Sequence, residues 1–177
     1  MSVELWDIYS SDGAKIGKTA VRGRGALKQG EYHLVVHIWI VSSSGELLIQ
    51  RRSDKKKLMP GEWAATGGAA VAGEDSFKAA KRELFEELGI MSDEETLKKL
   101  FRIKRRNSLL DVYAINSDIA ADDLHLQETE VAEAKWVSRE VLTSMIKNGK
   151  YHDYGREYFA KLFEDLDKFR FAVCKNC

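Results

Sequence analysis

The segment between Asp75 and Gly89 places the strongest constraint on how this chain can fold, because its apolar residues recur with the period of an α-helix. At about 100° per residue, four apolar side chains fall within about 80° of one another. They are Phe77, Ala80, Leu84 and Leu88. Asp75 or Ser76 is a suitable N-cap, and Gly89 is a suitable C-terminal stop. The segment therefore predicts a helix with one face buried in a hydrophobic core.

Acidic side chains gather beside this apolar stripe. Glu83, Glu86 and Glu87 fall within a neighbouring arc of about 100°. Arg82 lies four positions before Glu86, where it can neutralise and orient that carboxylate. Three like charges repel each other unless a cation is present, and hard oxygen ligands select Mg²⁺ or Mn²⁺. The helix alone leaves an ordinary charged surface open as the alternative, because Glu-Glu pairs are frequent on helices.

The rest of the chain alternates predicted strands with two further helices. An opening hairpin is predicted at 4–9 and 14–21, further strands at 30–41, 47–52, 97–106, 109–116 and 133–137, and helices after Ser138 to about Lys147 and at 155–166. Residues 53–63 form a predicted loop, because Pro60-Gly61 cannot continue a strand or a helix. This order predicts the α/β class, as a mixed sandwich of strands and helices.

Size and charge narrow the class of protein. The 177 residues predict one domain, with an N-terminal arm at 1–30, a core at 31–147 and a C-terminal helix and tail at 148–177. The 28 basic and 28 acidic residues balance, whereas a dominant nucleic-acid or membrane-surface role would show a basic excess.

The start of the chain lacks the pattern of a signal peptide, so a cytoplasmic location is expected. Cys174 and Cys177 predict a mobile reduced tail rather than a zinc site.

The predicted helix is part of a longer sequence motif that begins before it. From Gly68 to Ile90 the sequence follows the pattern G-x5-E-x7-R-E-U-x-E-E-x-G-U, in which U is apolar. Every specified position matches: Gly68, Glu74, Arg82, Glu83, Leu84, Glu86, Glu87, Gly89 and Ile90. This stretch resembles the Nudix box of the Nudix hydrolase superfamily. Independently of the name, a glycine at Gly68 lets the backbone approach a metal closely, and Glu74 lies within plausible reach of Arg82.

The resemblance implies a fold, an activity and a set of site residues. The fold would be an α/β/α sandwich around a mixed sheet, with the box as a loop-helix-loop. The activity would be hydrolysis of a small-molecule diphosphate, typically a nucleoside diphosphate linked to another group. Glu83, Glu86, Glu87 and the Gly68 carbonyl would hold Mg²⁺ or Mn²⁺, and Arg82 belongs with the catalytic residues. The metal would neutralise phosphate charge and lower the pKa of a bound water that attacks phosphorus.

The general base varies within the family. Glu83 is the first choice, and Glu128 or Glu130, on a distal loop, is the second. The alternative for these two is an ordinary solvated acidic loop.

Candidate substrate-binding residues lie outside the box. Arg51 and Arg52, followed by Lys55 to Lys57 in the next loop, can bind a diphosphate, and a solvated charged loop is the alternative.

Aromatic and imidazole side chains give weaker signals. Trp63 can stack on a base or pack in the core, and amphipathic tryptophans commonly bury. His37 is a candidate substrate contact in an apolar strand, where a hydrogen-bonded core histidine is the alternative; His33 shares its face of a strand. The basic run Arg102–Arg106 is predicted to be the charged end of a hairpin. Monomer and homodimer both remain open.

Two other functions compete with hydrolysis. The segments before the box are similar to the branch that contains isopentenyl-diphosphate isomerase and its hydrolase-like relatives. That isomerase uses a cysteine just before the box region, and here Gly67 or its neighbours occupy the place. A non-catalytic nucleotide-binding module is the other alternative, but degenerate modules usually lose box glutamates and this box is complete. Hydrolysis of a diphosphate is therefore the predicted function.

Overall fold

The computed structural model describes residues 3–25 and 27–174 of the chain. The strands are β1 Leu5–Tyr9, β2 Lys15–Val21, β3 His33–Val41, β4 Leu47–Arg52, β5 Trp63–Ala64, β6 Thr66–Ala69, β7 Lys98–Lys104, β8 Ser108–Asn116 and β9 Val131–Val137. The helices are α1 Ser76–Leu88, α2 Arg139–Lys147 and α3 Arg156–Cys174, with a short 3₁₀ turn, η1, at Ala121–Asp123. The predicted hairpin, central strands and helices are all present.

Strand β3 is the centre of the main sheet. Along one edge it pairs in parallel with β8, from His33–Ser108 to Val41–Asn116. Its other edge is shared by two strands. β4 pairs with it only at the end, through Ile40 and Val41, and β6 pairs with its middle. β3 and β4 therefore diverge. Beyond that point this edge of β4 pairs with β5, and β9 pairs along the other edge of β4.

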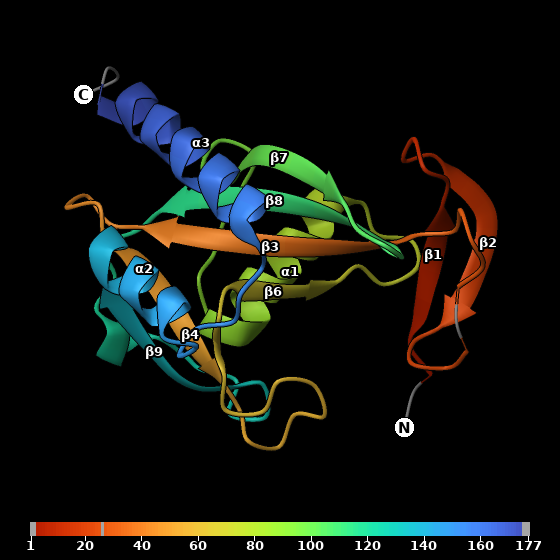
Figure 1. Ribbon diagram of the computed structural model, residues 1–177, viewed down its shortest axis with the longest axis horizontal. Helices are drawn as coiled ribbons and strands as arrows, with labels where there is room; N and C mark the ends of the chain where they lie inside the picture. Colours follow the sequence, from red (N-terminus) through yellow and green to blue (C-terminus); the bar gives the residue numbers. More distant parts are fainter. Residues whose placement is uncertain (1–2, 26, 175–177) are drawn as a thin grey trace.

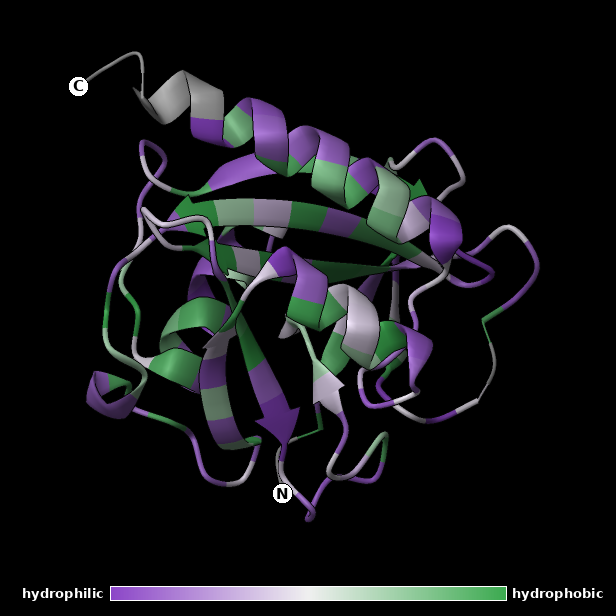
Figure 2. Cartoon of the chain, turned by 60° about the vertical axis from the view of Figure 1, so that its left-hand side comes forward, coloured by the Kyte–Doolittle hydropathy of each residue, from purple (hydrophilic) through white to green (hydrophobic). Residues whose placement is uncertain are grey.

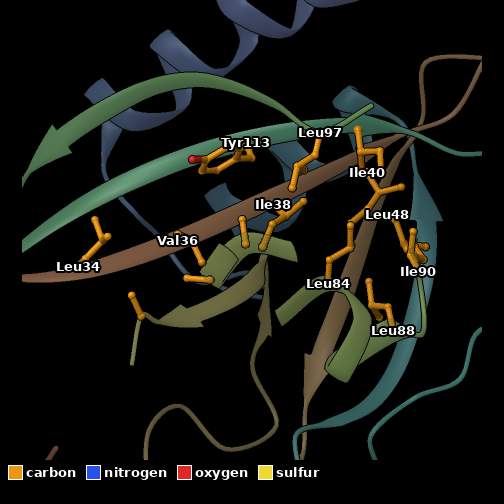
Figure 3. Packing of buried hydrophobic residues seen from close by; sticks show 14 of the residues in the cluster. Leu34, Val36, Ile38, Ile40, Leu48, Leu84, Leu88, Ile90, Leu97 and Tyr113 are labelled. Atoms are coloured by element: carbon orange, nitrogen blue, oxygen red, sulfur yellow. The ribbon is translucent and has the colours of Figure 1, made fainter. Parts of the chain in front are cut away.

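Alternation along β3 buries both faces of the sheet, which makes a sandwich of three layers (Figure 1). One face packs against α1, and Figure 3 shows this cluster, which includes Leu34, Val36, Ile38, Ile40, Leu84 and Leu88. The opposite face packs against α2 and α3 through Trp39, Val41, Leu142, Tyr158, Phe159, Leu162 and Leu166. In Figure 2 the central strands carry many hydrophobic residues, whereas hydrophilic residues lie on the outer surfaces of the helices and in the loops. The α/β/α sandwich expected from the box is confirmed.

Helix α1 begins and ends where the sequence indicates. The Asp75 side chain accepts a hydrogen bond from the Lys78 N–H at 2.8 Å. Gly89 adopts a left-handed conformation with φ of 72° and donates its N–H to the Phe85 carbonyl. In the predicted apolar stripe, Leu84 is completely buried, as are Ala80 and Leu88, while Phe77 is only partly buried.

The N-terminal hairpin β1–β2 forms a separate two-stranded sheet that lies beside the loop leading into α1 (Figure 1). The Trp6 ring stacks on His33 with 4.1 Å between centroids. Asp7 accepts hydrogen bonds from Lys15 Nζ at 2.6 Å and from the Gly73 N–H at 2.9 Å. These contacts hold the hairpin against the box loop.

Several details differ from the sequence-based prediction. β6 was not predicted, because its sequence TGGA has low strand propensity; pairing with β3 overrides that preference. The last helix extends beyond residue 166 to Cys174, and Phe169 still packs against the core. The two histidines of β3 do not form a pair, because His33 stacks on the hairpin and hydrogen-bonds the Asn107 carbonyl. The end of the predicted cysteine-containing tail, 175–177, lies outside the described residues.

No helix among the described residues is long and apolar enough to cross a lipid bilayer.

Gly67 is a position where the backbone itself excludes a side chain. Its φ is +149°, and an added Cβ would lie 2.0 Å from the Val36 carbonyl oxygen. Gly73 also has a positive φ, +93°, but a Cβ there meets nothing within 4 Å. We expect Gly73→Ala to cost about 1–2 kcal/mol of unfolding free energy, from backbone strain alone. Gly67→Ala adds a backbone clash, so we expect a loss of more than about 3 kcal/mol.

Urea denaturation of the two variants measures the difference. Equal losses would show that the close approach of β6 to β3 does not limit the residue at position 67.

Candidate active site

A cavity of about 380 Å³ opens where β3 and β4 diverge. Most of the predicted site residues line it, and they come from distant parts of the sequence. The lining includes the acidic residues of α1, Gly67 and Gly68 of β6, Arg52 of β4, Glu130, the β7–β8 turn and the segment before α3. The cavity therefore touches both the α1 side and the α3 side of the sheet.

Glu87 is the most buried acidic residue of the cavity, with 3% of its surface exposed. Its Oε2 accepts hydrogen bonds from Gln50 Nε2 at 2.9 Å and from the Gly67 N–H at 3.1 Å. Thr66 donates its hydroxyl proton to Gln50 Oε1, so the Gln50 amide nitrogen faces Glu87. Burial raises the pKa of Glu87 to about 8, and the charge of Glu83 adds to the effect.

Arg82 organises the other carboxylates. Its guanidinium binds both oxygens of Glu74, at 2.7 and 3.0 Å, which confirms the predicted contact between the two residues. Its Nη1 also donates to Glu83 Oε1 at 2.9 Å and to Glu86 Oε2 at 3.0 Å. The hydrogen bonds and charges of these acids raise the pKa of Arg82, with Glu74 contributing most, so the guanidinium stays charged. Arg82 thus holds the carboxylates of Glu74, Glu83 and Glu86 together.

The acidic cluster has the chemistry of a cation site. Glu83 Oε2, Glu86 Oε1 and Glu87 Oε1 make no hydrogen bond within the described part of the chain, so each carboxylate keeps one oxygen for a ligand. Burial raises the pKa of Glu83, and a nearby cation would relieve that cost. An added Cβ at Gly68 would lie 2.3 Å from Glu83 Oε1, so glycine keeps this side open. The residues fit a hard divalent cation.

Side-chain rotations are needed before these oxygens can share one ion. Among the described residues, no three His, Cys, Asp or Glu side chains converge closely enough to hold a metal as they stand. Arg82 instead holds one oxygen each of Glu83 and Glu86. Reorientation of these two carboxylates is the change that cation binding requires.

The two distal acids have different surroundings. Glu130 lines the cavity and forms an ion pair with Lys56. Its carbonyl accepts the Ser53 N–H at 2.8 Å, which fixes this loop against the end of β4. Glu128 is exposed and is not part of the cavity lining.

Adjacent arginines of β4 point in different directions. Arg52 lines the cavity, and its Nε donates to the Leu58 carbonyl at 3.1 Å. Arg51 instead faces the acids Asp54 and Glu133, at 3.4 and 3.6 Å. Trp63 is partly buried beneath Lys135, whose Nζ lies 4.0 Å from the ring centroid, and it does not line the cavity.

His37 lines the cavity as a neutral side chain. Burial lowers the pKa of His37 to about 3. Trp39 Nε1 donates to the Tyr158 hydroxyl at 2.8 Å, and that hydroxyl lies 3.0 Å from His37 Nδ1. The described residues offer the phenol proton no acceptor other than Nδ1, so we assign this proton to the bond with Nδ1, which leaves the imidazole proton on Nε2. The His37 ring thus has a defined tautomer, so it can act as a hydrogen-bond donor.

Arg105, His152 and Tyr154 are among the cavity residues that were not predicted as site residues. Arg105 lies beyond β7 on the same alternating series as Phe101 and Ile103, so the period of two was the available signal. Nothing local marks the other two, because they enter the cavity only through the path of the chain into α3.

Comparison with known proteins decides the family. The family model described as the NUDIX domain matches residues 31–162, well over half of the chain. The chain belongs to the Nudix family. The uncharacterized Nudix hydrolase lmo0368 of Listeria monocytogenes is 38% identical over 153 residues, covering 86% of this chain and 90% of that protein. Nudix hydrolase 3 of Arabidopsis thaliana is 32% identical over 182 residues, covering 93% of this chain but only 23% of that longer protein.

Solved structures support the same fold. The crystal structure of DR0079 from Deinococcus radiodurans has a TM-score of 0.74 at 26% identity, covering 85% of this chain and 93% of that one. The protein is thus a Nudix hydrolase, and hydrolases of this family generally act on diphosphate linkages with divalent metals such as Mg²⁺ or Mn²⁺. The more specific resemblance to the isomerase branch stays a prediction.

The raised pKa of Glu87 predicts how metal-free stability depends on pH. The folded state keeps the Glu87 proton up to about pH 8, whereas the unfolded chain releases it near 4.5. The resulting stabilisation is fully present below pH 4.5 and is lost as the pH rises towards 8, at about 1.4 kcal/mol per pH unit at most. Glu87→Gln lacks this titration.

Urea denaturation of both proteins with a chelator, from pH 5 to 8.5, provides the measurement. We expect the unfolding free energy of wild type minus that of the variant to fall across this range. A difference that does not change with pH would contradict the burial of a titrating Glu87.

Proposed function

We propose that this Nudix hydrolase cleaves the diphosphate linkage of a small molecule, first of all a nucleoside diphosphate derivative. Glu83, Glu86, Glu87 and the Gly68 carbonyl would hold Mg²⁺ or Mn²⁺. One observation carries the proposal: a single cavity joins the acids of α1 to cationic side chains. Acids suit a metal, and cations suit phosphate oxygens, so the two together fit a metal-bound diphosphate.

Different side chains of the cavity would have different roles in hydrolysis. Glu83 is the first candidate to take the proton of the attacking water, and Glu130 is the second. Arg82 orients Glu83 and Glu86 through its Nη1. Arg52 has no carboxylate partner among the described residues, so its guanidinium can bind phosphate oxygens. Arg51 and Trp63 do not line the cavity, so they would contact a substrate only if the ends of β4 and β5 moved.

The hydrolysis step requires only the substrate and one water molecule as reactants. The water oxygen bonds to phosphorus, the bridging P–O bond breaks, and the leaving phosphate carries its electron pair. The proton of the water passes to the carboxylate base. A bound divalent cation would neutralise phosphate charge and lower the pKa of water.

A substrate panel tests the activity. It contains nucleoside diphosphates and triphosphates, nucleotide sugars, dinucleotides and isopentenyl diphosphate, each with and without Mg²⁺, with products separated by chromatography so that an isomer is also detected. We expect Mg²⁺-dependent cleavage of one class. Glu87→Gln should lower turnover at least 10²-fold by removing a metal charge. The matched control Glu94→Gln changes an exposed acid outside the cavity and should retain full activity.

Full activity of the Glu87→Gln variant would overturn the metal-site assignment. Isomerisation of isopentenyl diphosphate without hydrolysis would instead support the isomerase alternative.

The general base is tested separately by comparing Glu83→Gln with Glu130→Gln. Loss of the base should lower kcat by about 10²–10⁴-fold and remove the acidic limb of the pH profile of kcat/KM. We expect this result for Glu83→Gln. A flattened limb only in Glu130→Gln would transfer the role to the distal loop, and unchanged limbs in both variants would exclude both residues.

A further inference from the structure

We infer that Arg105, Tyr154 and His37 form a phosphate subsite, here called the α3 subsite, which holds the terminal phosphate of the substrate. The inference rests on the proposed hydrolase function and adds the orientation of the substrate. It also names the substrate class: molecules whose diphosphate ends in a free phosphate, rather than those capped on both sides.

Arg105 supplies the charge of the α3 subsite. It follows β7, lines the cavity and is partly buried. Its guanidinium carbon lies 5.7 Å from the centroid of the Tyr154 ring. Within the described residues it forms no ion pair with a carboxylate, whereas nearby Arg102 is paired with Asp111 at 2.6 Å. A partly buried guanidinium without a counterion is a favourable site for an oxyanion.

Tyr154 presents its hydroxyl rather than a ring face. The Ala65 N–H donates to its oxygen at 3.1 Å, which leaves the phenol proton for another acceptor. The ring is surrounded by His37, His152 and Tyr158, with centroid distances of 4.6, 4.9 and 5.0 Å, in addition to Arg105. This packing leaves little room for a nucleobase to stack on Tyr154.

His37 contributes a third donor. The hydrogen-bond chain from Trp39 through Tyr158 places its proton on Nε2, and the described residues supply no acceptor for that proton. The ring lies in the wall of the cavity. The side chain therefore offers an uncharged N–H of fixed orientation.

The composition of the α3 subsite selects the ligand. Arg105, Tyr154 and His37 all offer donors. Of the nearby acids, Glu62 is paired with His152 at 2.9 Å. Glu87 uses Oε2 for Gln50 and Gly67, and its Oε1 is the oxygen left for the cation. A nucleobase or a sugar presents donors as well as acceptors, and a prenyl chain presents neither. A terminal phosphate presents only acceptor oxygens, so it matches this end of the cavity.

Burial raises the pKa of Glu83, and the charge of Arg22 partly offsets this effect. Burial likewise raises the pKa of Tyr154, and the charge of Glu87 adds to the effect. The acids of α1 therefore lie between the α3 subsite and the N-terminal hairpin, next to which Glu4 and Arg22 line the cavity. A diphosphate with its terminal phosphate on Arg105 would place its inner phosphate near the α1 acids. The organic group would then extend towards the hairpin. A substrate capped at both phosphates would have to place a neutral group against unpaired donors, which costs binding energy.

Binding of uncleavable probes tests the subsite without requiring turnover. The full chain with Mg²⁺ is titrated calorimetrically with methylenebisphosphonate, with its P,P′-dimethyl ester and with inorganic phosphate. We expect Arg105→Gln to weaken methylenebisphosphonate binding at least 10-fold and to change dimethyl-ester binding less than 3-fold. Arg105→Lys should recover part of the loss, and Tyr154→Phe should show a smaller loss. Arg106→Gln, the exposed neighbour, is the matched control and should bind like wild type.

Each other outcome overturns the inference. A loss confined to inorganic phosphate would show a site for free phosphate rather than for the substrate terminus. Equal losses for the capped and uncapped probes would show a general charge effect. Identical affinities in the Arg105 and Arg106 variants, or no binding of the uncapped probe by wild type, would remove the subsite altogether. Thermal melts of every variant separate these outcomes from misfolding, and failed hydrolysis would leave the binding results intact.

Discussion

The burial of Glu87 is the constraint on which the arrangement of the site depends. Leu84 and Leu88 anchor α1 in the core with no exposed surface. Glu87 directly precedes Leu88, so packing of the helix against the core also buries the Glu87 carboxylate. A buried carboxylate is costly unless other groups satisfy it. Gln50 from β4 and the Gly67 N–H from β6 do so, which fastens the helix to both halves of the sheet.

The divergence of β3 and β4 explains why one cavity reaches both sides of the sandwich. β4 leaves β3 after two residue pairs, and β6 takes its place on β3. Gly67 permits this, because its backbone approaches the Val36 carbonyl too closely for any side chain. The opening joins the acids of α1 to the donors beneath α3. Separation of the two charge types across one opening suits a ligand that combines a cation with phosphate groups.

Local patterns predicted much of this structure. The caps of α1 and α2, the buried strand β3 and the acids beside the apolar stripe all depend on residues close together in sequence, where period and capping are informative. β6 was missed because two glycines lower its strand propensity, and only pairing with β3 stabilises it. Arg105 was assigned to a charged hairpin end because its contact with Tyr154 joins separate segments of the chain.

The sequence by itself determined the family, the helix that carries the acids and the identity of those acids, since each is written within Gly68 to Ile90. Only the tertiary structure decided how these acids are placed. It buries Glu87 and binds Glu83 and Glu86 to Arg82, and it directs Arg52 into the cavity while Arg51 faces away. It also sets the tautomer of His37 through Tyr158, 121 positions away. The reason is physical: periodicity selects the face of an element, whereas desolvation and hydrogen bonding depend on what packs against that face.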